Sequence, residues 1–452
     1  MPERGAPGGR RQGSGVDARG RVVLSSGDPE PDATVAVREG TPRPFLGWRI
    51  VGGAVAMQSL QSLLFWQSFG TYAALWMADF GWSRTTIAWA ASLQRTESGL
   101  LGPLHGWWLD RSSPRRVFVV GVLLMGGGLI ALGFVQNFVQ FMVLYLVTSV
   151  GSSLCGMLTL MTVIVNWFER RRARAMSALQ LGLSVGSLAL PLLAWALVTF
   201  GWRPVIVASG VLIIACGLPI ARLMHRNPEM LGMRPDGDEP GPGPTLPAPP
   251  AARTARRSWA GGALRTPAFW LISIGHGAAL AIMSGVGVHF VIYATEVLAI
   301  SITTAATLMA VMTAAAVVGQ VLGGTVGDQV DKRWLAGSAM LAHAGAMVAL
   351  VLADGVALVV VAAVLHGLGW GVRGPLMGAM RADYFGRAAF ASVMGFSSLV
   401  VMFGSVGGPL VIGLVADGTG SYAGGFGALA VVGLFGAVAF FVLGKPNPPR
   451  AA

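Results

Sequence analysis

The chain has 452 residues, of which 54% are hydrophobic and only 12% are charged. Soluble domains carry about 25% charged residues, so this composition excludes a soluble protein of this length. Most of the surface is expected to meet lipid, and long apolar runs are the signature of that class.

The net charge of +12 does not indicate a nucleic-acid partner, because the basic residues lie in short stretches between apolar runs rather than on one soluble face. The two cysteines, Cys155 and Cys216, lie inside apolar runs. They show neither disulfide nor metal-ligand spacing, so no metal or other cofactor is expected.

Apolar runs of about 20 residues, the length that crosses a bilayer, predict twelve helices in two groups of six. They are expected at 48–76, 85–108, 117–136, 139–166, 177–200 and 203–223, and then at 268–294, 303–327, 334–353, 356–380, 389–416 and 422–443.

Five regions follow from these runs. Residues 1–44 are expected to be a disordered tail, since they lack the apolar core of a signal peptide. Two six-helix bundles are expected at 45–223 and 265–444. The Pro/Gly/Arg-rich residues 224–264 predict a flexible linker between them, and 445–452 form a second tail.

The basic residues also predict the orientation of the chain. If both termini are cytoplasmic, 28 of the 32 Lys and Arg residues fall on the cytoplasmic side, Arg381 in a loop after the tenth run among them. The opposite loops carry two, Arg84 and Arg203. The expected location is therefore the plasma (inner) membrane, crossed many times, with cytoplasmic termini.

An internal repeat appears when the second half of the sequence is laid over the first. In one register without gaps, Gly106 falls on Gly324, Asp110 on Asp328, Met176 on Met394 and Pro191 on Pro409. This repeat register joins the second, fourth and fifth runs to the eighth, tenth and eleventh. Such repeats are typical of secondary transporters, which bind substrate near mid-membrane between their halves.

The stretch 102–116 reads Gly-x-x-x-Gly-x-x-x-Asp-Arg-x-x-x-Arg-Arg. Together with its reduced copy at 324–333 it resembles the signatures of the major facilitator superfamily, over roughly 45–444 of the chain. Ser113-Pro114 is a departure, because the superfamily signature usually has glycine after Asp-Arg-x. The resemblance implies an all-α membrane protein of two pseudo-symmetric six-helix bundles, which is a transporter and not an enzyme.

Phe80-Gly-Trp-Ser-Arg84 is similar to the monocarboxylate-porter and oxalate/formate-antiporter branches of that superfamily. The resemblance implies a small organic anion, a mono- or dicarboxylate, carried by proton symport or anion exchange. The partners expected are this solute, protons and the lipid bilayer, and the chain is expected to act as a monomer.

A conformational latch is expected where the signature lies. Its residues would be Gly102, Gly106, Asp110, Arg111, Arg115, Arg116, and in the second copy Asp328 and Arg333. The carboxylates would accept hydrogen bonds from a neighbouring helix end and from loop arginines in one state, and release them in the other. The alternative is a helix-end acid with solvated basic partners.

Arg95 and Glu97 fall near the middle of the second run, where ionisable groups are costly and mark function by default. We interpret them, with His289, as residues of proton or charge coupling. The alternative for Arg95 and Glu97 is a static buried network that fixes helix packing, and for His289 a hydrogen-bonded core histidine.

His366, Trp370 and Arg373 share one face of the tenth helix. The resemblance implies that this helix lines the central cavity. A guanidinium matches a carboxylate with two parallel hydrogen bonds, so these residues, with Gln58 and Gln61, are the predicted substrate site. The alternative is an arginine bonded to helix carbonyls around Pro375.

The function predicted first is secondary active transport by alternating access. A second candidate is an exporter of amphipathic drugs or metabolites. A third, of another class, is a sensor with a transporter fold and no flux. A phosphate-binding loop with a following lysine does not occur in the sequence, which argues against an ATP-driven pump.

Overall fold

The computed structural model describes residues 15–16, 22–23, 45–82, 84–238 and 262–446. Within helices, the side chains of 84–88, 90–93, 95, 98, 302, 303 and 306 lie outside this description. The chain divides into two units, Met1–Pro44 and Phe45–Ala452. In the first, β1 (Gly15–Val16) pairs antiparallel with β2 (Val22–Val23); the rest of the expected tail falls outside the described residues.

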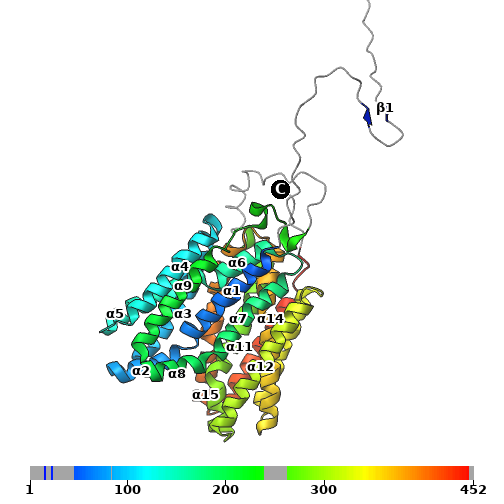
Figure 1. Cartoon of the computed structure of the whole chain (residues 1–452). Helices are drawn as coiled ribbons and strands as arrows, with labels where there is room; N and C mark the ends of the chain where they lie inside the picture. Colours follow the sequence, from blue (N-terminus) through cyan, green and yellow to red (C-terminus); the bar gives the residue numbers. More distant parts are fainter. Residues whose placement is uncertain (1–14, 17–21, 24–44, 83, 239–261, 447–452) are drawn as a thin grey trace, which may run out of the picture. The chain divides into compact units, whose positions relative to one another are not determined.

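The first half of the second unit consists of six helical passes (Figure 1). They are α1 (Gly47–Gln61) with the π-helical η1 (Ser62–Trp66) and α2 (Phe69–Phe80); α3 (Arg84–Arg111); α4 (Pro114–Leu132); α5 (Phe138–Cys155) with α6 (Met157–Trp167); α7 (Arg172–Leu188) with α8 (Leu190–Phe200); and α9 (Trp202–Ala221).

Six more passes form the second half. They are α11 (Pro267–Ile292) with η4 (Tyr293–Val297), α12 (Ile302–Val326), α13 (Lys332–Val351), α14 (Val356–Phe385), α15 (Phe390–Thr419) and α16 (Tyr422–Phe441). The twelve predicted spans and the all-α fold of this unit are confirmed. Among the described residues, ten helical segments are long and apolar enough to cross a membrane.

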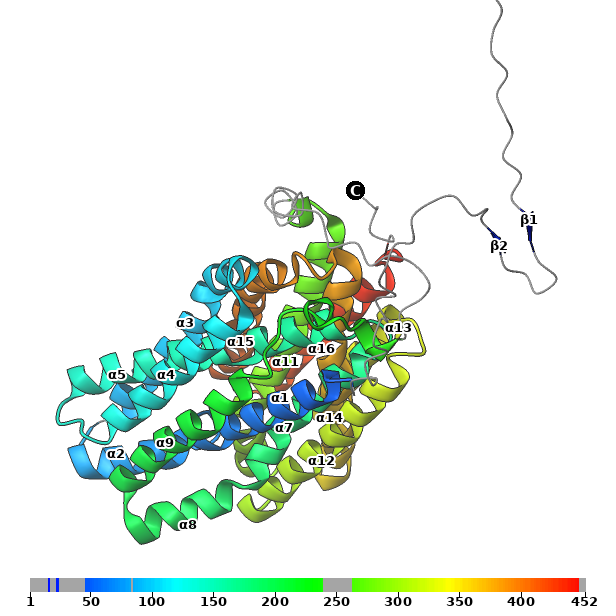
Figure 2. The same ribbon diagram turned by 45° about the horizontal axis from the view of Figure 1, so that its top comes forward.

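Each half has its own apolar core. One buried cluster centres on the first half, with Met57, Phe118 and Trp167, and a second centres on the other half, with Phe269, Met340 and Phe440. Within the halves α4 packs against α5 and α12 against α14, as Figure 2 shows.

The two halves meet through a pair of equivalent contacts. α3 packs against α15, and α7 packs against α12. In the repeat register of the sequence, α3 corresponds to α12 and α7 to α15, so these are the same contact made twice. The repeat that the sequence predicts is therefore a repeat of packing as well.

The segment after α9 differs from the flexible linker expected from residue 224 onward. It forms two 3₁₀ turns, η2 (Pro228–Leu231) and η3 (Pro235–Gly237). The carboxylate of Asp236 accepts hydrogen bonds from the backbone N–H groups of Glu169, Arg170 and Arg171, at 3.0, 2.8 and 3.2 Å. Proline and glycine here set tight turns that dock on the first half, and residues 239–261 lie outside the described part.

The expectation that Arg381 lies in a loop is wrong. α14 continues past the predicted end at 380 to Phe385, and Gly386, with a φ of 72°, ends it. A left-handed backbone of this kind favours glycine. Arg381 is therefore a buried helix residue, 1% exposed, and does not contribute to the charge of the loops.

Candidate functional site

A break in the fourth pass organises the centre of the first half. α5 ends at Cys155 and α6 begins at Met157, because Gly156 has a non-helical ψ of −152°. Carbonyls freed by a break inside a membrane need other donors. Gln61 Nε2 donates to the Ser152 carbonyl at 3.2 Å, and the Thr159 hydroxyl donates to the Leu154 carbonyl at 2.6 Å.

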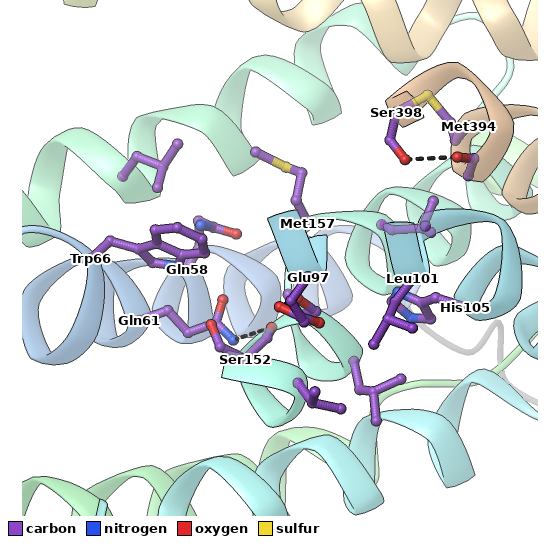
Figure 3. A pocket seen from close by; sticks show the side chains of 18 residues that line it. Gln58, Gln61, Trp66, Glu97, Leu101, His105, Ser152, Met157, Met394 and Ser398 are labelled. Carbon is purple, nitrogen blue, oxygen red and sulfur yellow. Dashed lines mark hydrogen bonds between the residues drawn. The ribbon is translucent and has the colours of Figure 1, made fainter. Parts of the chain in front are cut away.

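A cavity of about 390 Å³ lies beside this break (Figure 3). Its walls come from five passes, four in the first half and α15 in the second. The lining residues include Gln58 and Gln61 of α1, Trp66 of η1, Glu97, Leu101, Gly102 and His105 of α3, Ser152, Ser153 and Met157 of the broken pass, Leu183 of α7, and Met394, Gly395 and Ser398 of α15. The cavity therefore lies where the two halves meet.

Glu97 is the acidic group of this cavity, with only 6% of its surface exposed. Its Oε2 accepts hydrogen bonds from the hydroxyls of Ser149 and Ser153, at 2.7 and 3.3 Å. Its Oε1 is buried without a hydrogen-bond partner among the described residues. Glu97 is among the side chains that line the cavity in Figure 3, so a ligand in that cavity, or a proton, could satisfy the open oxygen.

His105 lies on the same face of α3 as Glu97 and lines the same cavity. It was not among the predicted site residues. Its Nε2 lies 3.0 Å from the Thr159 hydroxyl. Because that hydroxyl gives its own proton to the Leu154 carbonyl, Thr159 accepts from His105, which places a proton on Nε2 of His105. The signal available in the sequence was the shared face of Glu97, Leu101 and His105.

Arg373 lies elsewhere, inside the second half. It is fully buried, and none of its three guanidinium nitrogens has a hydrogen-bond partner among the described residues. Its guanidinium carbon lies 5.1 Å from the centre of the Trp370 ring, a cation–π distance. Arg373 and Trp370 therefore lie on one face of α14, as expected. The described residues show no hydrogen bond from Arg373 to a helix carbonyl near Pro375, which was the alternative.

His366, the third predicted residue on this face, has a partner that the sequence did not indicate. Its Nδ1 lies 3.2 Å from Nδ1 of His343 on α13, and both rings are buried. Gly369, on α14 between His366 and Arg373, makes room for this ring, since a Cβ there would lie 3.3 Å from His343 Nε2.

Arg381 is a second buried guanidinium on α14. It donates to the Met377 carbonyl at 3.0 Å, to His276 Nδ1 at 3.1 Å and to the Ser397 hydroxyl at 2.6 Å. Among the described ion pairs neither Arg373 nor Arg381 has a carboxylate partner. As far as the described residues go, the second half thus holds two buried cations without a counter-charge.

The predicted substrate site therefore divides into two places. Gln58 and Gln61 line the cavity with Glu97, whereas Arg373, Trp370 and His366 lie in the second half and do not line it. His289 lies apart from both, with its Nε2 bonded to the Pro409 carbonyl at 3.0 Å and its ring beside Tyr422. The side chain of Arg95 falls outside the described residues.

The predicted latch residues lie at the contact between the halves. A Cβ on Gly102 would lie 2.0 Å from the Ser398 hydroxyl, and one on Gly106 would lie 2.2 Å from the Ala391 carbonyl. Asp110 accepts hydrogen bonds from the backbone N–H of Ser392, at 3.2 Å, and from the Ser392 hydroxyl. The small residues let α3 and α15 approach closely, and the acid then meets the start of α15.

Of the arginines expected beside Asp110, Arg111 lies over the Trp107 ring at 4.3 Å, and Arg115 and Arg116 are exposed. The ion pairs of the described part of the chain do not join any of these three to Asp110. The contact that Asp110 makes across the halves is therefore with a helix start.

Asp328 makes the equivalent contact in the second copy. It accepts hydrogen bonds from the backbone N–H groups of Ala173, at 2.7 Å, and Arg174, at 3.2 Å, at the start of α7. Burial raises the pKa of this carboxyl, and the hydrogen bonds and nearby cations oppose that shift without cancelling it.

Arg333 does not bind Asp328 as the copy of the signature suggested. Its Nε instead donates to Asp331 at 3.0 Å, because Asp331 lies close by in the sequence and caps the start of α13. This pairing holds the pKa of Asp331 below its ordinary value.

Further contacts join the halves near these acids, at what we call the Asp110 end. Arg172 pairs with Asp383, and Arg387 contacts Glu169 at 3.5 Å and Glu229 at 3.3 Å. Ser177 donates to the Gln320 carbonyl. Among the described residues, the ion pair at the other end, Arg203 with Asp79, lies within the first half, so the halves are closed at the Asp110 end.

Comparison with known proteins gives the same architecture. The family model of the Major Facilitator Superfamily matches residues 55–298 and 272–452. The solved structure of the Escherichia coli fucose:proton symporter FucP superposes with a TM-score of 0.64 at 14% identity, covering 89% of this chain and 98% of that chain. The likeness to FucP concerns the fold alone.

Curated relatives match over shorter stretches. Monocarboxylate transporter 14 of Mus musculus is 24% identical over 177 residues, 38% of this chain and 34% of that protein. The Fujikurins efflux protein of Gibberella fujikuroi is 28% identical over 198 residues, 41% of this chain and 42% of that protein. The chain thus aligns with less than half the length of each of these two relatives.

Proposed function

Since the chain belongs to the Major Facilitator Superfamily, a family of membrane transporters, we propose that it carries a small organic acid anion, a mono- or dicarboxylate, together with protons. The observation that carries this proposal is Arg373, buried with three nitrogens that lack a partner among the described residues. A buried charge without a counter-charge costs several kcal/mol, and a carboxylate that binds the guanidinium with two hydrogen bonds removes that cost.

The cavity supports the coupling part of the proposal. Glu97 has one oxygen without a hydrogen-bond partner among the described residues and lies in a space of about 390 Å³. A carboxylate substrate that passes this cavity on its way to Arg373, which does not line it, would be repelled by an ionised Glu97. The anion therefore enters with Glu97 protonated, which couples its movement to a proton.

The cycle itself would follow from the contacts between the halves. With the orientation expected from the basic residues, the Asp110 end is cytoplasmic, and the described state is closed to the cytoplasm. Release of Asp110 from α15 and of Asp328 from α7 would open that side. The solute can drive this change only by binding the two states with different affinity.

Thermal unfolding of the purified full chain tests this function. Lactate, as a monocarboxylate, and oxalate, as a dicarboxylate, are the probes. At least one of them is expected to raise the melting temperature of the wild type by mass action, and to shift Arg373→Gln far less. Arg222→Gln is the matched control, because Arg222 is exposed after α9. If no organic acid shifts the wild type, or if both variants respond alike, the proposal is wrong.

A second candidate rests on the lining of the cavity. As far as the described residues line it, the cavity contains Glu97 with Trp66, Met157 and Met394, and neither Arg nor Lys. An acid among aromatic and thioether side chains suits an amphipathic cation or neutral metabolite, and one relative is named as an efflux protein. In the same assay, a shift with amphipathic amines but not with lactate or oxalate would favour export.

A further inference from the structure

Two buried histidines of the second half face each other, His343 of α13 and His366 of α14. Their Nδ1 atoms lie 3.2 Å apart, and the ring planes meet at 65°. A hydrogen bond between two Nδ1 atoms needs one ring to donate and the other to accept. The exposed fractions are 0% and 4%, so water contributes little to either ring.

The tautomers follow from the outer nitrogens. His343 Nε2 is fully buried without a partner among the described residues. A buried N–H without an acceptor is rarer in proteins than an acceptor without a donor. We therefore assign Nδ1–H to His343, which donates to His366 Nδ1 and leaves a free lone pair on its own Nε2. A proton added to that lone pair keeps the bond between the rings and gives it charge assistance. The new N–H lacks an acceptor among the described residues, so the pair is expected to hold this proton only when an added negative charge offsets that cost.

The groups that face this pair are positive or neutral. On α14 the charged group that faces them is Arg373. Arg381 lies further along α14 and donates to Nδ1 of His276 on α11, and the other histidine of α11, His289, is bonded to the Pro409 carbonyl. α12 and α6 have no titratable residue, α16 has only Tyr422, which packs against Tyr293, and α15 has Asp417, which is exposed. On α7, Arg172 and Arg174 pair with Asp383 and Asp328. A positive charge on the histidines is therefore opposed by the Arg373 guanidinium.

An anion on Arg373 would change this balance, because it cancels the nearest positive charge. We propose that the His343–His366 pair is a proton site coupled to anion binding, and that it takes up one proton from solvent on His343 Nε2 when a carboxylate binds Arg373. The proton leaves when the anion leaves. The coupling is reciprocal by linkage, and it rests on the proposed anion function. It adds a proton site in the second half to Glu97 in the first.

Isothermal titration of the full-length protein with lactate tests the pair directly, because repeating it in buffers of different ionisation enthalpy counts the protons taken up per bound anion. The pair is expected to contribute about one proton. His343→Asn and His366→Asn, in which an amide replaces Nδ1, are expected to bind lactate and to lose that proton. Glu97→Gln is expected to keep it, and so is the control His225→Asn, a histidine after α9 outside the cluster.

The outcomes separate the two claims. If both histidine variants bind lactate and take up as many protons as the wild type, the proton site is wrong and the anion function stands. Loss of binding in both, with unchanged melting temperatures, would make the histidines binding groups and also overturn the inference. If neither lactate nor oxalate binds the wild type, the anion function itself fails.

If the histidine variants do not fold, the wild type and Glu97→Gln still test the proposal. Uptake of about one proton requires the affinity for lactate to rise by up to about tenfold for each unit fall in pH. Glu97→Gln is expected to retain this pH dependence. If the lactate affinity of Glu97→Gln does not change with pH, the histidine pair takes up no proton on binding, which would contradict the proposal.

Discussion

Asp110 accepts a hydrogen bond from the backbone N–H of Ser392 at 3.2 Å, across the contact between α3 and α15. Asp328 accepts one from the backbone N–H of Arg174 at the same distance, across the contact between α12 and α7. In the repeat register Asp328 is the counterpart of Asp110, and Ser392 is the counterpart of Arg174. The repeat thus places one acid of each half on the helix start of the other, where partial positive charge favours a carboxylate.

The first prediction concerns Asp110. Asp110→Asn keeps the size of the side chain but removes its charge, which weakens its hydrogen bonds to Ser392 by about 1–2 kcal/mol. The variant is expected to raise the population open at the Asp110 end about tenfold. Spin labels on Arg222→Cys and Gln329→Cys, in a Cys216→Ser background, report the opening as a longer distance. An unchanged distance distribution in Asp110→Asn would show that the charge of Asp110 does not hold this end closed.

The second prediction concerns the close approach of α3 to α15. In Gly106→Ala the new Cβ would lie 2.2 Å from the Ala391 carbonyl, so the two helices must separate, at about 1–3 kcal/mol. The same spin-label pair should show the open state. In the control Gly127→Ala, on α4, the Cβ would meet nothing within 4 Å, and no change is expected. An equal effect of both substitutions would rule out a specific contact at Gly106.

The third prediction is a pH dependence. Burial raises the pKa of Asp328 in the closed state above its ordinary value of about 3.9, which it regains once water reaches the carboxylate. The closed state therefore binds more protons. This contribution to closure is full below the ordinary pKa and is lost as pH rises through the raised one.

Acidification from pH 7.5 towards 5 is accordingly expected to shorten the mean distance between the labels on Arg222→Cys and Gln329→Cys, and Asp328→Asn is expected to reduce this response. A distance that grows on acidification in the wild type, with no such growth in Asp328→Asn, would reverse the sign and contradict the assignment.

The fourth prediction separates the two buried arginines by stability. Arg373→Met replaces an unpaired buried charge by an apolar chain, and such changes are neutral or stabilising by about 1–4 kcal/mol. Arg381→Met removes three hydrogen bonds and is expected to destabilise by about 1–3 kcal/mol. Melting temperatures without ligand should move in opposite directions. A clear loss of stability in Arg373→Met would mean that its guanidinium has a structural role.

Sequence periodicity sufficed to predict the twelve passes, because apolar length alone determines what can span a bilayer. The equivalence of Asp110 and Asp328 could also be predicted, since the repeat register pairs them directly. What the sequence could not supply is tertiary. Arg333 could equally have faced Asp328, and only the fold brings His343 to His366 from another helix.

The predicted substrate site shows the same limit. His366, Trp370 and Arg373 do share a face of α14, as helical spacing requires. Which neighbours that face meets depends on helix rotation within the bundle. His366 meets His343 of α13, and none of the three lines the cavity with Gln58 and Gln61. Glycines at 369, 371 and 374 set this rotation by close packing. A single sequence shows these glycines but not which helix packs against each of them.

Uptake by proteoliposomes tests the central claim most directly. With an inward proton gradient, protein reconstituted alone is expected to accumulate labelled lactate or oxalate. Arg373→Met is expected to reduce the rate at least about tenfold, the equivalent of about 1.4 kcal/mol of lost interaction, and Arg222→Gln to leave it unchanged. Equal uptake by wild type and Arg373→Met, or a protein that binds these anions without any flux, would contradict the account.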